Sequence, residues 1–169
     1  AFCYAYKEQT IIIFKANGFL RGQVRLMVAN LLKKQFAKRL TKKTYIAITT
    51  SIPKLEKARI DLPIARNPKK PATFKVSSNG KVAITDYKVL KTNKNYALIE
   101  LMPKTGRTHQ LRVHLNYINC PILGDKIYGT KKADRMYLHA EKLEITIPNK
   151  GRMTFEAKLP KEFKDIFEK

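Results

Sequence analysis

TGRTHQLRVHL, the stretch from Thr105 to Leu115, is where the chain changes from strand-like alternation to helical spacing. Beyond the Thr–Gly pair that opens it, apolar residues recur on one helical face, at Leu111, Leu115 and Ile118, until Pro121 ends the pattern. The stretch also carries two arginines and two histidines. Such residues serve nucleic-acid contact, metal binding or catalysis, and the rest of the sequence distinguishes among the three.

The histidine spacing argues against a metal site. His109 and His114 are five residues apart, which on a helix points them about 140° from each other, unlike the i,i+4 pair of a metal-binding helix. His139 stands alone in a strand-like segment, and Cys3 and Cys120 form no C-x-x-C pattern. We therefore expect no metal, two reduced thiols and histidines that serve as hydrogen-bonded structural residues.

The charge balance points to a polyanionic partner. Thirty-five Lys and Arg residues against 13 Asp and Glu residues give a net charge of +22, which is spread along the chain. Phosphate backbones are the commonest partners of such a surface, although solvated surface lysines are the alternative explanation. No glycine-rich phosphate loop and no G-x-S-x-G motif is present in the sequence, which argues against a nucleotidase or a serine hydrolase.

The expected compartment is the cytoplasm. No apolar stretch approaches the length that spans a bilayer, and the opening residues do not resemble a secretory signal. A hydrophobic content of 44% is enough for the core of one domain, so we expect a soluble globule with no membrane partner.

Strand-like and helical segments alternate with hairpin signals, which predicts an α/β (α+β) fold with a largely antiparallel mixed sheet and packed helices. The segment from Ser51 to Pro71 holds four prolines, and RNPKKP within it predicts a solvated basic loop. Helices are expected from Phe19, after Gly106 and in the closing PKEFKDIFEK. Strands are expected at Gln9–Lys15, Lys43–Thr50, Lys81–Leu90, Tyr96–Met102, Tyr137–Ile147 and Met153–Ala157.

Several spaced motifs carry a family resemblance. TGRTHQLRVHL, followed by PILGDKIYG and LHA, resembles the C-terminal half of the RluA-type RNA pseudouridine synthases. The resemblance extends back through GKVAITDYKVL and LPIAR to QFAKRLTKKTYIAI, and so covers about Leu31 to the end. It implies a pseudouridine synthase-like fold and an isomerase that detaches uracil from ribose, rotates it and reattaches it through carbon, with no cofactor and no metal.

The resemblance also assigns two active-site residues. Tyr45 of KKTY resembles the tyrosine that stacks on the target base, and Arg112 of QLRVH resembles the arginine that pairs with the catalytic aspartate. A fixed guanidinium lowers the pKa of a carboxylate that must stay ionised, and a planar ring holds a flipped-out uracil. Without the resemblance, a core aromatic and a surface cation would be the ordinary interpretations of these two residues.

The nucleophile that the family would supply is not recognisable. It should lie upstream in a segment resembling HRLDxxTSG, yet all five aspartates follow Tyr45, and none stands in an Arg-Leu-Asp context. Asp125 matches the family's Gly-Asp pair, which we interpret as structural. The five are Asp61, Asp86, Asp125, Asp134 and Asp165.

The residues before this half resemble a different branch of the superfamily. FKANGFLRGQVRLMVANLL resembles the last active-site motif of the TruA-type transfer RNA pseudouridine synthases, with Arg25 in the position that Arg112 takes in QLRVHL. We therefore divide the chain into a TruA-like strand–helix segment, 1–32, and an RluA-type half, 33–169. Either the chain is a composite of two pieces, or it has kept an RNA-binding surface and lost the chemistry.

The expected function is isomerisation of uridine to pseudouridine in structured RNA, either rRNA or tRNA, by a monomer. The alternative is a catalytically silent RNA-binding domain or fragment descended from such an enzyme. The expected substrate-binding residues are Arg25, Arg66, Lys69, Lys70, Arg107, Thr108, His109, Gln110, Lys131 and Lys132.

Overall fold

The computed structural model describes residues 2–6, 9–13, 33–147 and 150–168. The chain forms two compact units, and each is described by itself. The larger comprises Lys43–Glu141 and Lys158–Lys169, and the smaller comprises Ala1–Lys42 and Lys142–Ala157. No helix among the described residues is long and apolar enough to cross a membrane.

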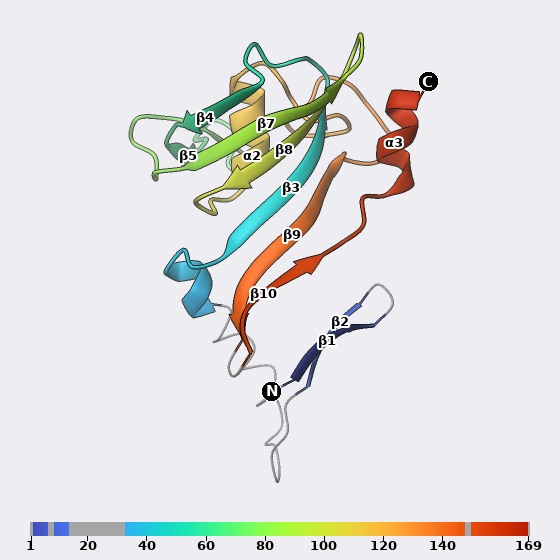
Figure 1. Cartoon of the computed structure of the whole chain (residues 1–169). Coiled ribbons are helices and arrows are strands. Elements are labelled where there is room, and N and C mark those ends of the chain that lie inside the picture. The colour runs from blue at the N-terminus through green and yellow to red at the C-terminus, as the bar shows by residue number, and fades with distance from the viewer. Residues whose placement is uncertain (1, 7–8, 14–32, 148–149, 169) are drawn as a thin grey trace. The chain divides into compact units, whose positions relative to one another are not determined.

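The larger unit is built on an antiparallel sheet (Figure 1). Its strand order is β9-β3-β8-β7-β4, and Tyr45 on β3 lies opposite Leu101 on β8. All strand pairings whose registers are described are antiparallel, so the predicted fold class is confirmed. The strands are β3 (Lys42–Thr49), β4 (Lys57–Asp61), β7 (Ile84–Thr92), β8 (Ala97–Pro103) and β9 (Leu138–Ile147), of which the residues from Lys142 on belong to the smaller unit.

One helix covers each face of this sheet, because successive side chains of a strand point to opposite faces. Ala47 of β3 lies in a cluster with Leu111 and Leu115 of α2 (Gln110–Tyr117). The neighbouring Ile46 and Ile48 pack with Phe163 of α3 (Lys161–Glu168), whose side chain is fully buried. The helices predicted after Gly106 and in the closing segment are thus confirmed.

A small hairpin stands beside the main sheet of the larger unit. β5 (Ile64–Arg66) pairs with β6 (Phe74–Val76), and the loop between them is the predicted basic RNPKKP segment, in which Lys69 and Lys70 are exposed. A Cβ on Gly80 would lie 2.5 Å from the backbone carbon of Ile64, so only glycine permits this close approach.

Three strands of the larger unit, β4, β5 and β6, were not predicted, and neither was the strand at Phe2–Tyr6 of the smaller unit. The prolines of Ser51–Pro71 masked the first two, but Pro53 and Pro63 lie just outside β4, which is the last strand in the sheet order. Proline is tolerated at such edges because no hydrogen bond of the ladder is lost. The strand predicted from Lys81 begins only at Ile84, because Lys81 bridges to Ile64 of the hairpin instead.

The smaller unit contains two antiparallel hairpins. β9 pairs with β10 (Gly151–Glu156), and β1 (Phe2–Tyr6) pairs with β2 (Gln9–Ile13). Residues 33–37 are helical, and the side-chain amide of Gln35 donates to the carbonyl oxygen of Thr146 and accepts from its N–H, at 2.8 and 2.7 Å. Most of the helix predicted from Phe19 lies outside the described residues, and so does Arg25.

Candidate active site

The turn that leads into α2 is held by the side chain of Gln110. The Gln110 carbonyl oxygen accepts from the Thr105 hydroxyl at 2.7 Å and from the Arg107 N–H at 2.9 Å. Its amide nitrogen donates to the Ile84 carbonyl at 2.9 Å. Since Gln110 is 4% exposed and every polar atom of its side chain is bonded, this predicted RNA-binding residue serves to position the turn against β7.

The same amide continues into a buried chain of hydrogen bonds. Gln110 Nε2 donates to the Thr85 hydroxyl at 3.0 Å, and that hydroxyl lies 3.0 Å from His114 Nδ1. His114 Nε2 lies 3.0 Å from the Leu62 carbonyl, which can only accept, so the proton is on Nε2 and Nδ1 accepts from Thr85. This confirms that His114 is a hydrogen-bonded structural histidine. Burial lowers its pKa, although its bond to Leu62 acts in the opposite direction.

Arg112 forms a bidentate pair with Asp125. Its Nε and Nη2 donate to the two carboxylate oxygens of Asp125 at 2.7 and 2.6 Å. The Arg112 side chain is 14% exposed and that of Asp125 is fully buried, so the interpretation of Arg112 as a surface cation does not hold. Asp125 Oδ1 also accepts the N–H groups of Ile127 and Tyr128, at 2.9 and 3.1 Å.

The pKa of Asp125 reflects two opposing effects. Burial by itself raises it, but the hydrogen bond from Arg112 and the two backbone N–H bonds together lower it below its ordinary value. The bond to Asp125 likewise raises the pKa of Arg112. Asp125 is therefore an ionised carboxylate with no exposed oxygen, which agrees with the structural role expected from the Gly-Asp motif.

Glycines allow the PILGDKIYG loop to bring Asp125 to Arg112. Gly124 has a φ of +74°, and a Cβ there would overlap the carbonyl oxygen of Arg135. A Cβ on Gly129 would overlap the carbonyl oxygen of Asp125 itself. Both positions exclude any side chain, so the motif's glycines set the path of the loop.

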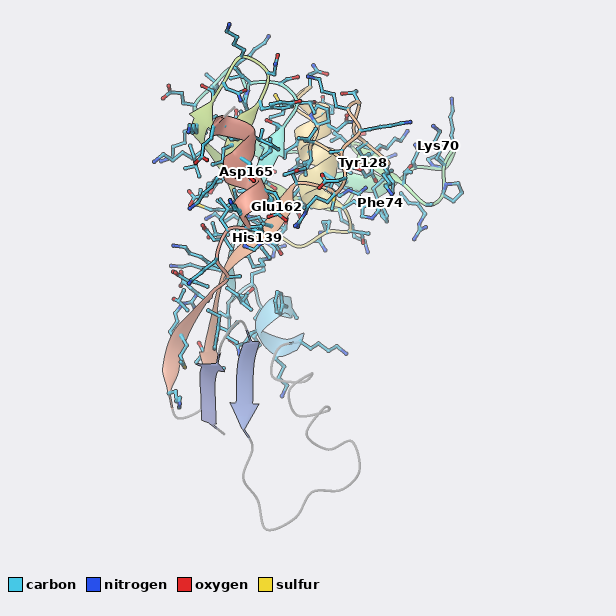
Figure 2. The ribbon with its side chains drawn as sticks, turned by 90° about the vertical axis from the view of Figure 1, so that its right-hand side faces the viewer. Lys70, Phe74, Tyr128, His139, Glu162 and Asp165 are labelled. Carbon is cyan, nitrogen blue, oxygen red and sulfur yellow. The ribbon has the colours of Figure 1, made fainter. Side chains whose placement is uncertain are left out.

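A row of cations and rings extends from Arg112. Its guanidinium lies 4.9 Å from the ring centroid of Tyr128, whose hydroxyl lies 2.9 Å from His109 Nδ1. The backbone N–H of Phe74 donates to this hydroxyl at 2.8 Å, so the hydroxyl proton is available to His109. The ring of His109 lies edge-on to that of Phe74, and Figure 2 shows Phe74 and Tyr128 side by side.

His109 takes an unusual backbone conformation at the start of α2. Its φ is +55°, the left-handed region that non-glycine residues seldom adopt. The contacts of its ring with Phe74 and Tyr128 accompany this strained position. Burial and the nearby charge of Arg112 lower the pKa of His109, so its imidazole is a neutral ring in this row. The sequence showed no signal for the roles of Phe74 and Tyr128 beyond the KIYG motif.

Tyr45 belongs to the same core cluster as the α2 face. It lies on β3, partly buried, and packs on the cluster that contains Ala47 and Leu111. Burial raises the pKa of its hydroxyl. Its ring is thus a neutral, partly exposed aromatic surface, and the fold brings it and Arg112 to elements that share one core.

The other predicted RNA-binding residues fall into three places. Arg66, Arg107 and Thr108 line one cavity, and Lys131 and Lys132 line another of about 330 Å³. Lys131 also lies 5.0 Å from the ring centroid of Tyr96. Lys69 and Lys70 belong to the β5–β6 loop, and Figure 2 shows Lys70 at its outer end.

No second aspartate bonds Arg112 among the described residues. Asp86 is engaged by Arg59 at 2.7 Å and by Lys104 at 3.3 Å, and Asp134 accepts from the Tyr137 hydroxyl. The described residues also contain no group of three His, Cys, Asp or Glu side chains that could hold a metal ion. The catalytic carboxylate that Arg112 was expected to pair with is therefore neither Asp86 nor Asp134.

Residues 25–117 match the family model described as RNA pseudouridylate synthase. The chain belongs to this family. It is 36% identical to an uncharacterized RNA pseudouridine synthase of Zymomonas mobilis over 97% of this chain and 80% of that protein. It is 38% identical to ribosomal large subunit pseudouridine synthase D of Borreliella burgdorferi, over 87% of this chain. It is also 42% identical to ribosomal large subunit pseudouridine synthase C of Rickettsia typhi, over 91% of this chain.

Solved structures agree with the family. Human RNA pseudouridylate synthase domain containing 1 superposes with a TM-score of 0.70 at 28% identity, over 78% of this chain and 60% of that one. Human RNA pseudouridylate synthase domain containing 4 gives 0.68 at 30% identity, over 84% and 67%. The bacterial relatives in these comparisons are named as pseudouridine synthases, which are isomerases. The chain spans only 47% and 51% of the Borreliella and Rickettsia typhi relatives.

Replacing Asp125 by Asn leaves the buried Arg112 without a compensating charge. We expect the free energy of unfolding to fall by about 3 kcal/mol, because breaking one side of a buried pair is costly. Asp86→Asn is the matched control, since the Arg59 side chain is 60% exposed and such pairs contribute at most about 1 kcal/mol. Urea unfolding at pH 7 measures both, and equal losses would contradict the importance of the buried pair.

The lowered pKa of His114 predicts a pH dependence of stability. His114 binds a proton less readily in the folded chain than in the unfolded chain, in which the pKa of a histidine is about 6.5. The stability due to neutral His114 is therefore present above that pH and is lost as the pH falls below it. We expect a smaller free energy of unfolding at pH 5.0 than at 7.5, and an NMR titration midpoint for His114 below 6.5. Equal stability at both pH values would refute this.

Proposed function

We propose that this chain supplies the arginine helix and the base-stacking tyrosine of a pseudouridine synthase that isomerises uridine in structured RNA, and that another segment supplies the nucleophilic aspartate. The observation that carries the proposal is the rigid Arg112–Asp125 pair at the start of α2, within a chain of this family. The reaction breaks the bond between N1 of uracil and C1′ of the ribose, forms a bond from C5 to C1′, releases the C5 proton and leaves a proton on N1. No net oxidation occurs, so the proposed reaction includes no cofactor. Relatives from Borreliella and Rickettsia are named for the large ribosomal subunit, which favours rRNA over tRNA.

Arg112 is proposed to orient the nucleophile. Asp125 takes the Nε and Nη2 edge of the guanidinium, which leaves the Nη1 edge to donate to a second carboxylate. A carboxylate bound there has its pKa lowered by the adjacent positive charge and stays ionised for attack. Asp125 is thus a positioning residue that fixes the plane of the guanidinium.

We propose that another segment of the protein carries the nucleophilic aspartate. It is none of the five aspartates of this sequence, which are Asp61, Asp86, Asp125, Asp134 and Asp165. Asp125 has its oxygens occupied and no exposed surface, and Asp86 is neutralised by two cations. The Borreliella and Rickettsia relatives are about twice as long as the part that this chain spans. Such a protein has further segments that can carry the aspartate of the family motif.

Tyr45 is proposed to hold the target uracil by stacking. Its ring is neutral, because burial raises the pKa of the hydroxyl, and its partial exposure leaves surface for a planar base. We also propose that the protein is a cytoplasmic monomer and that RNA is its partner. The segment 1–32 is proposed to be a TruA-like strand–helix segment that precedes the RluA-type half, 33–169.

The Arg112 assignment predicts a strong effect of a conservative substitution. In a tritium-release assay with 5-tritiated uridine RNA and the protein that includes the aspartate segment, Arg112→Lys should lower turnover at least about tenfold, because one ammonium cannot replace the planar guanidinium. Arg59→Lys, the same change at an exposed pair, should stay within about twofold. Near wild-type turnover of Arg112→Lys would refute the role. RNA binding without any release by the protein that includes the aspartate segment would support the silent RNA-binding domain instead.

RNA binding should depend steeply on salt, because each contacted phosphate releases counterions. Lys69→Gln together with Lys70→Gln should make the slope of log affinity against log salt shallower by about 1.4 to 1.8. Lys54→Gln with Lys57→Gln removes two other exposed lysines and should leave the slope unchanged. Fluorescence anisotropy with a labelled RNA hairpin measures both, and binding that is indifferent to salt would contradict the electrostatic contribution.

A further inference from the structure

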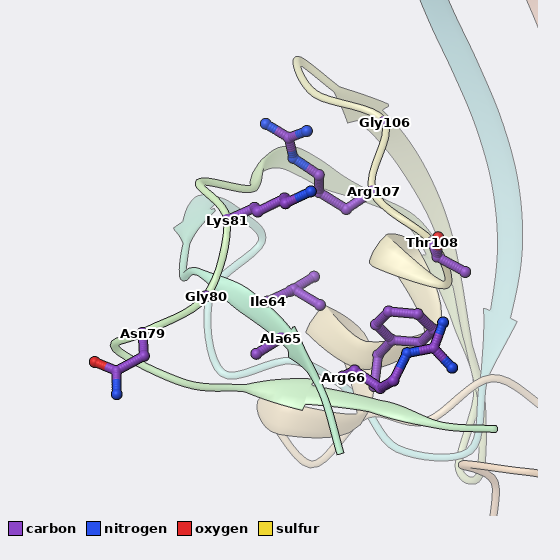
Figure 3. A pocket seen from close by; sticks show the side chains of 10 residues that line it. Ile64, Ala65, Arg66, Asn79, Gly80, Lys81, Gly106, Arg107 and Thr108 are labelled. Atoms are coloured by element: carbon purple, nitrogen blue, oxygen red, sulfur yellow. The ribbon is translucent and has the colours of Figure 1, made fainter. Parts of the chain in front are cut away.

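A cavity of about 510 Å³ lies between the β5–β6 hairpin and the turn before α2 (Figure 3). Ile64 and Ala65 line it from the hairpin, Gly80 and Lys81 from the following turn, and Gly106–Thr108 from the other side. Its volume is within the range of sites that take small organic ligands. The described residues that line it include three cations and no acidic side chain.

Two of these cations mark one end of the cavity. Figure 3 shows the side chains of Arg107 and Lys81 at the same end. Arg107 Nε donates to the Val82 carbonyl at 3.0 Å, which orients the guanidinium and leaves its two terminal nitrogens to donate elsewhere. Like charges that gather without a carboxylate repel each other and favour a bound anion. A phosphate group matches both the charge and the donors.

The other end offers a flat surface. The Arg66 guanidinium lies 5.3 Å from the ring centroid of Phe74 and is held by a hydrogen bond from its Nη1 to the Pro71 carbonyl at 2.6 Å. Such a fixed guanidinium plane is a surface on which bases of single-stranded RNA stack. The Thr108 side chain lies at this end in Figure 3 and supplies a hydroxyl that can both donate and accept.

The cavity is linked to Arg112 by direct contacts, but it is a separate site. Phe74 lines the cavity and contacts His109, which bonds Tyr128, and Arg112 lies over the ring of Tyr128. Arg112 itself does not line the cavity. A ligand here lies beside the proposed catalytic residue without occupying its place.

We propose that this cavity binds one nucleotide of the RNA strand next to the target uridine. Its phosphate lies on Arg107 and Lys81, and its base stacks on the Arg66 guanidinium that Phe74 supports. The assignment to a nucleotide that flanks the target uridine rests on the proposed function. The expectation that the cavity binds an anionic group and a planar base rests only on its lining residues. The site selects single-stranded or flipped-out nucleotides, because a paired base cannot enter a pocket of this kind.

The test is an NMR titration of the whole ¹⁵N-labelled chain with uridine 5′-monophosphate. We expect saturable shifts of the Gly80, Arg107 and Thr108 amides, with uridine binding at least tenfold more weakly because it has no phosphate. Arg107→Gln with Lys81→Gln should weaken binding at least tenfold, and Lys54→Gln with Lys57→Gln should not change it. Inorganic phosphate should bind at least threefold more weakly than the nucleotide.

The results of this titration test the nucleotide site independently of catalysis. Absence of saturable shifts at these amides, or shifts that survive Arg107→Gln with Lys81→Gln, would overturn the nucleotide site even if the chain isomerises uridine. Inorganic phosphate that binds as tightly as the nucleotide would overturn the base contact. Saturable nucleotide binding at these amides, with no tritium release by the protein that includes the aspartate segment, would support the site and contradict the catalytic proposal.

Discussion

The buried pair between Arg112 and Asp125 is the interaction on which the candidate site depends. Removing two charges from water costs about as much as their attraction returns, so such a pair contributes little net stability. Its effect is orientation: two hydrogen bonds fix the guanidinium plane, and two backbone N–H groups fix the carboxylate. The loop that carries Asp125 follows its path only because Gly124 and Gly129 have no side chains. The helix α2 and the PILGDKIYG loop thereby hold the Arg112 guanidinium in a single position.

A second set of contacts places the helix itself. Gln110, Thr85 and His114 form a chain of hydrogen bonds in which each donor faces an acceptor, from the turn before α2 to the carbonyl of Leu62. In a low-dielectric interior an unmatched member of such a chain would be costly, so the arrangement specifies one register of α2 on the sheet. The motif that carries the family resemblance is thus largely a positioning device. Gln110, Arg112 and His114 point into the protein, whereas Arg107 and Thr108 line the cavity.

The sequence predicted this region well because its signals are local. The helical spacing of Leu111 and Leu115 and the closing Pro160 need no knowledge of the fold, and the helices that they predicted are present. The five-residue spacing of His109 and His114 correctly suggested hydrogen-bonded histidines. The strands β4 and β5 were missed because prolines dominate the local pattern, while their pairing with β7 and β6 is non-local. Likewise, no spacing in the sequence links Arg66 to Phe74 or Phe74 to Tyr128.

The sequence by itself determined the family, the basic surface and the positions of Arg112 and Tyr45, because these depend on motifs and composition along the chain. Only the tertiary structure decided what these residues contact. It placed Asp125, 13 positions after Arg112, against the guanidinium, and it assigned Gln110 and His114 to the interior. It also brought Arg66, Lys81 and Arg107 from three separate segments to one cavity. The physical reason is that hydrogen bonds and ion pairs join atoms in space, and residues distant in sequence become neighbours only when the sheet and its loops have formed.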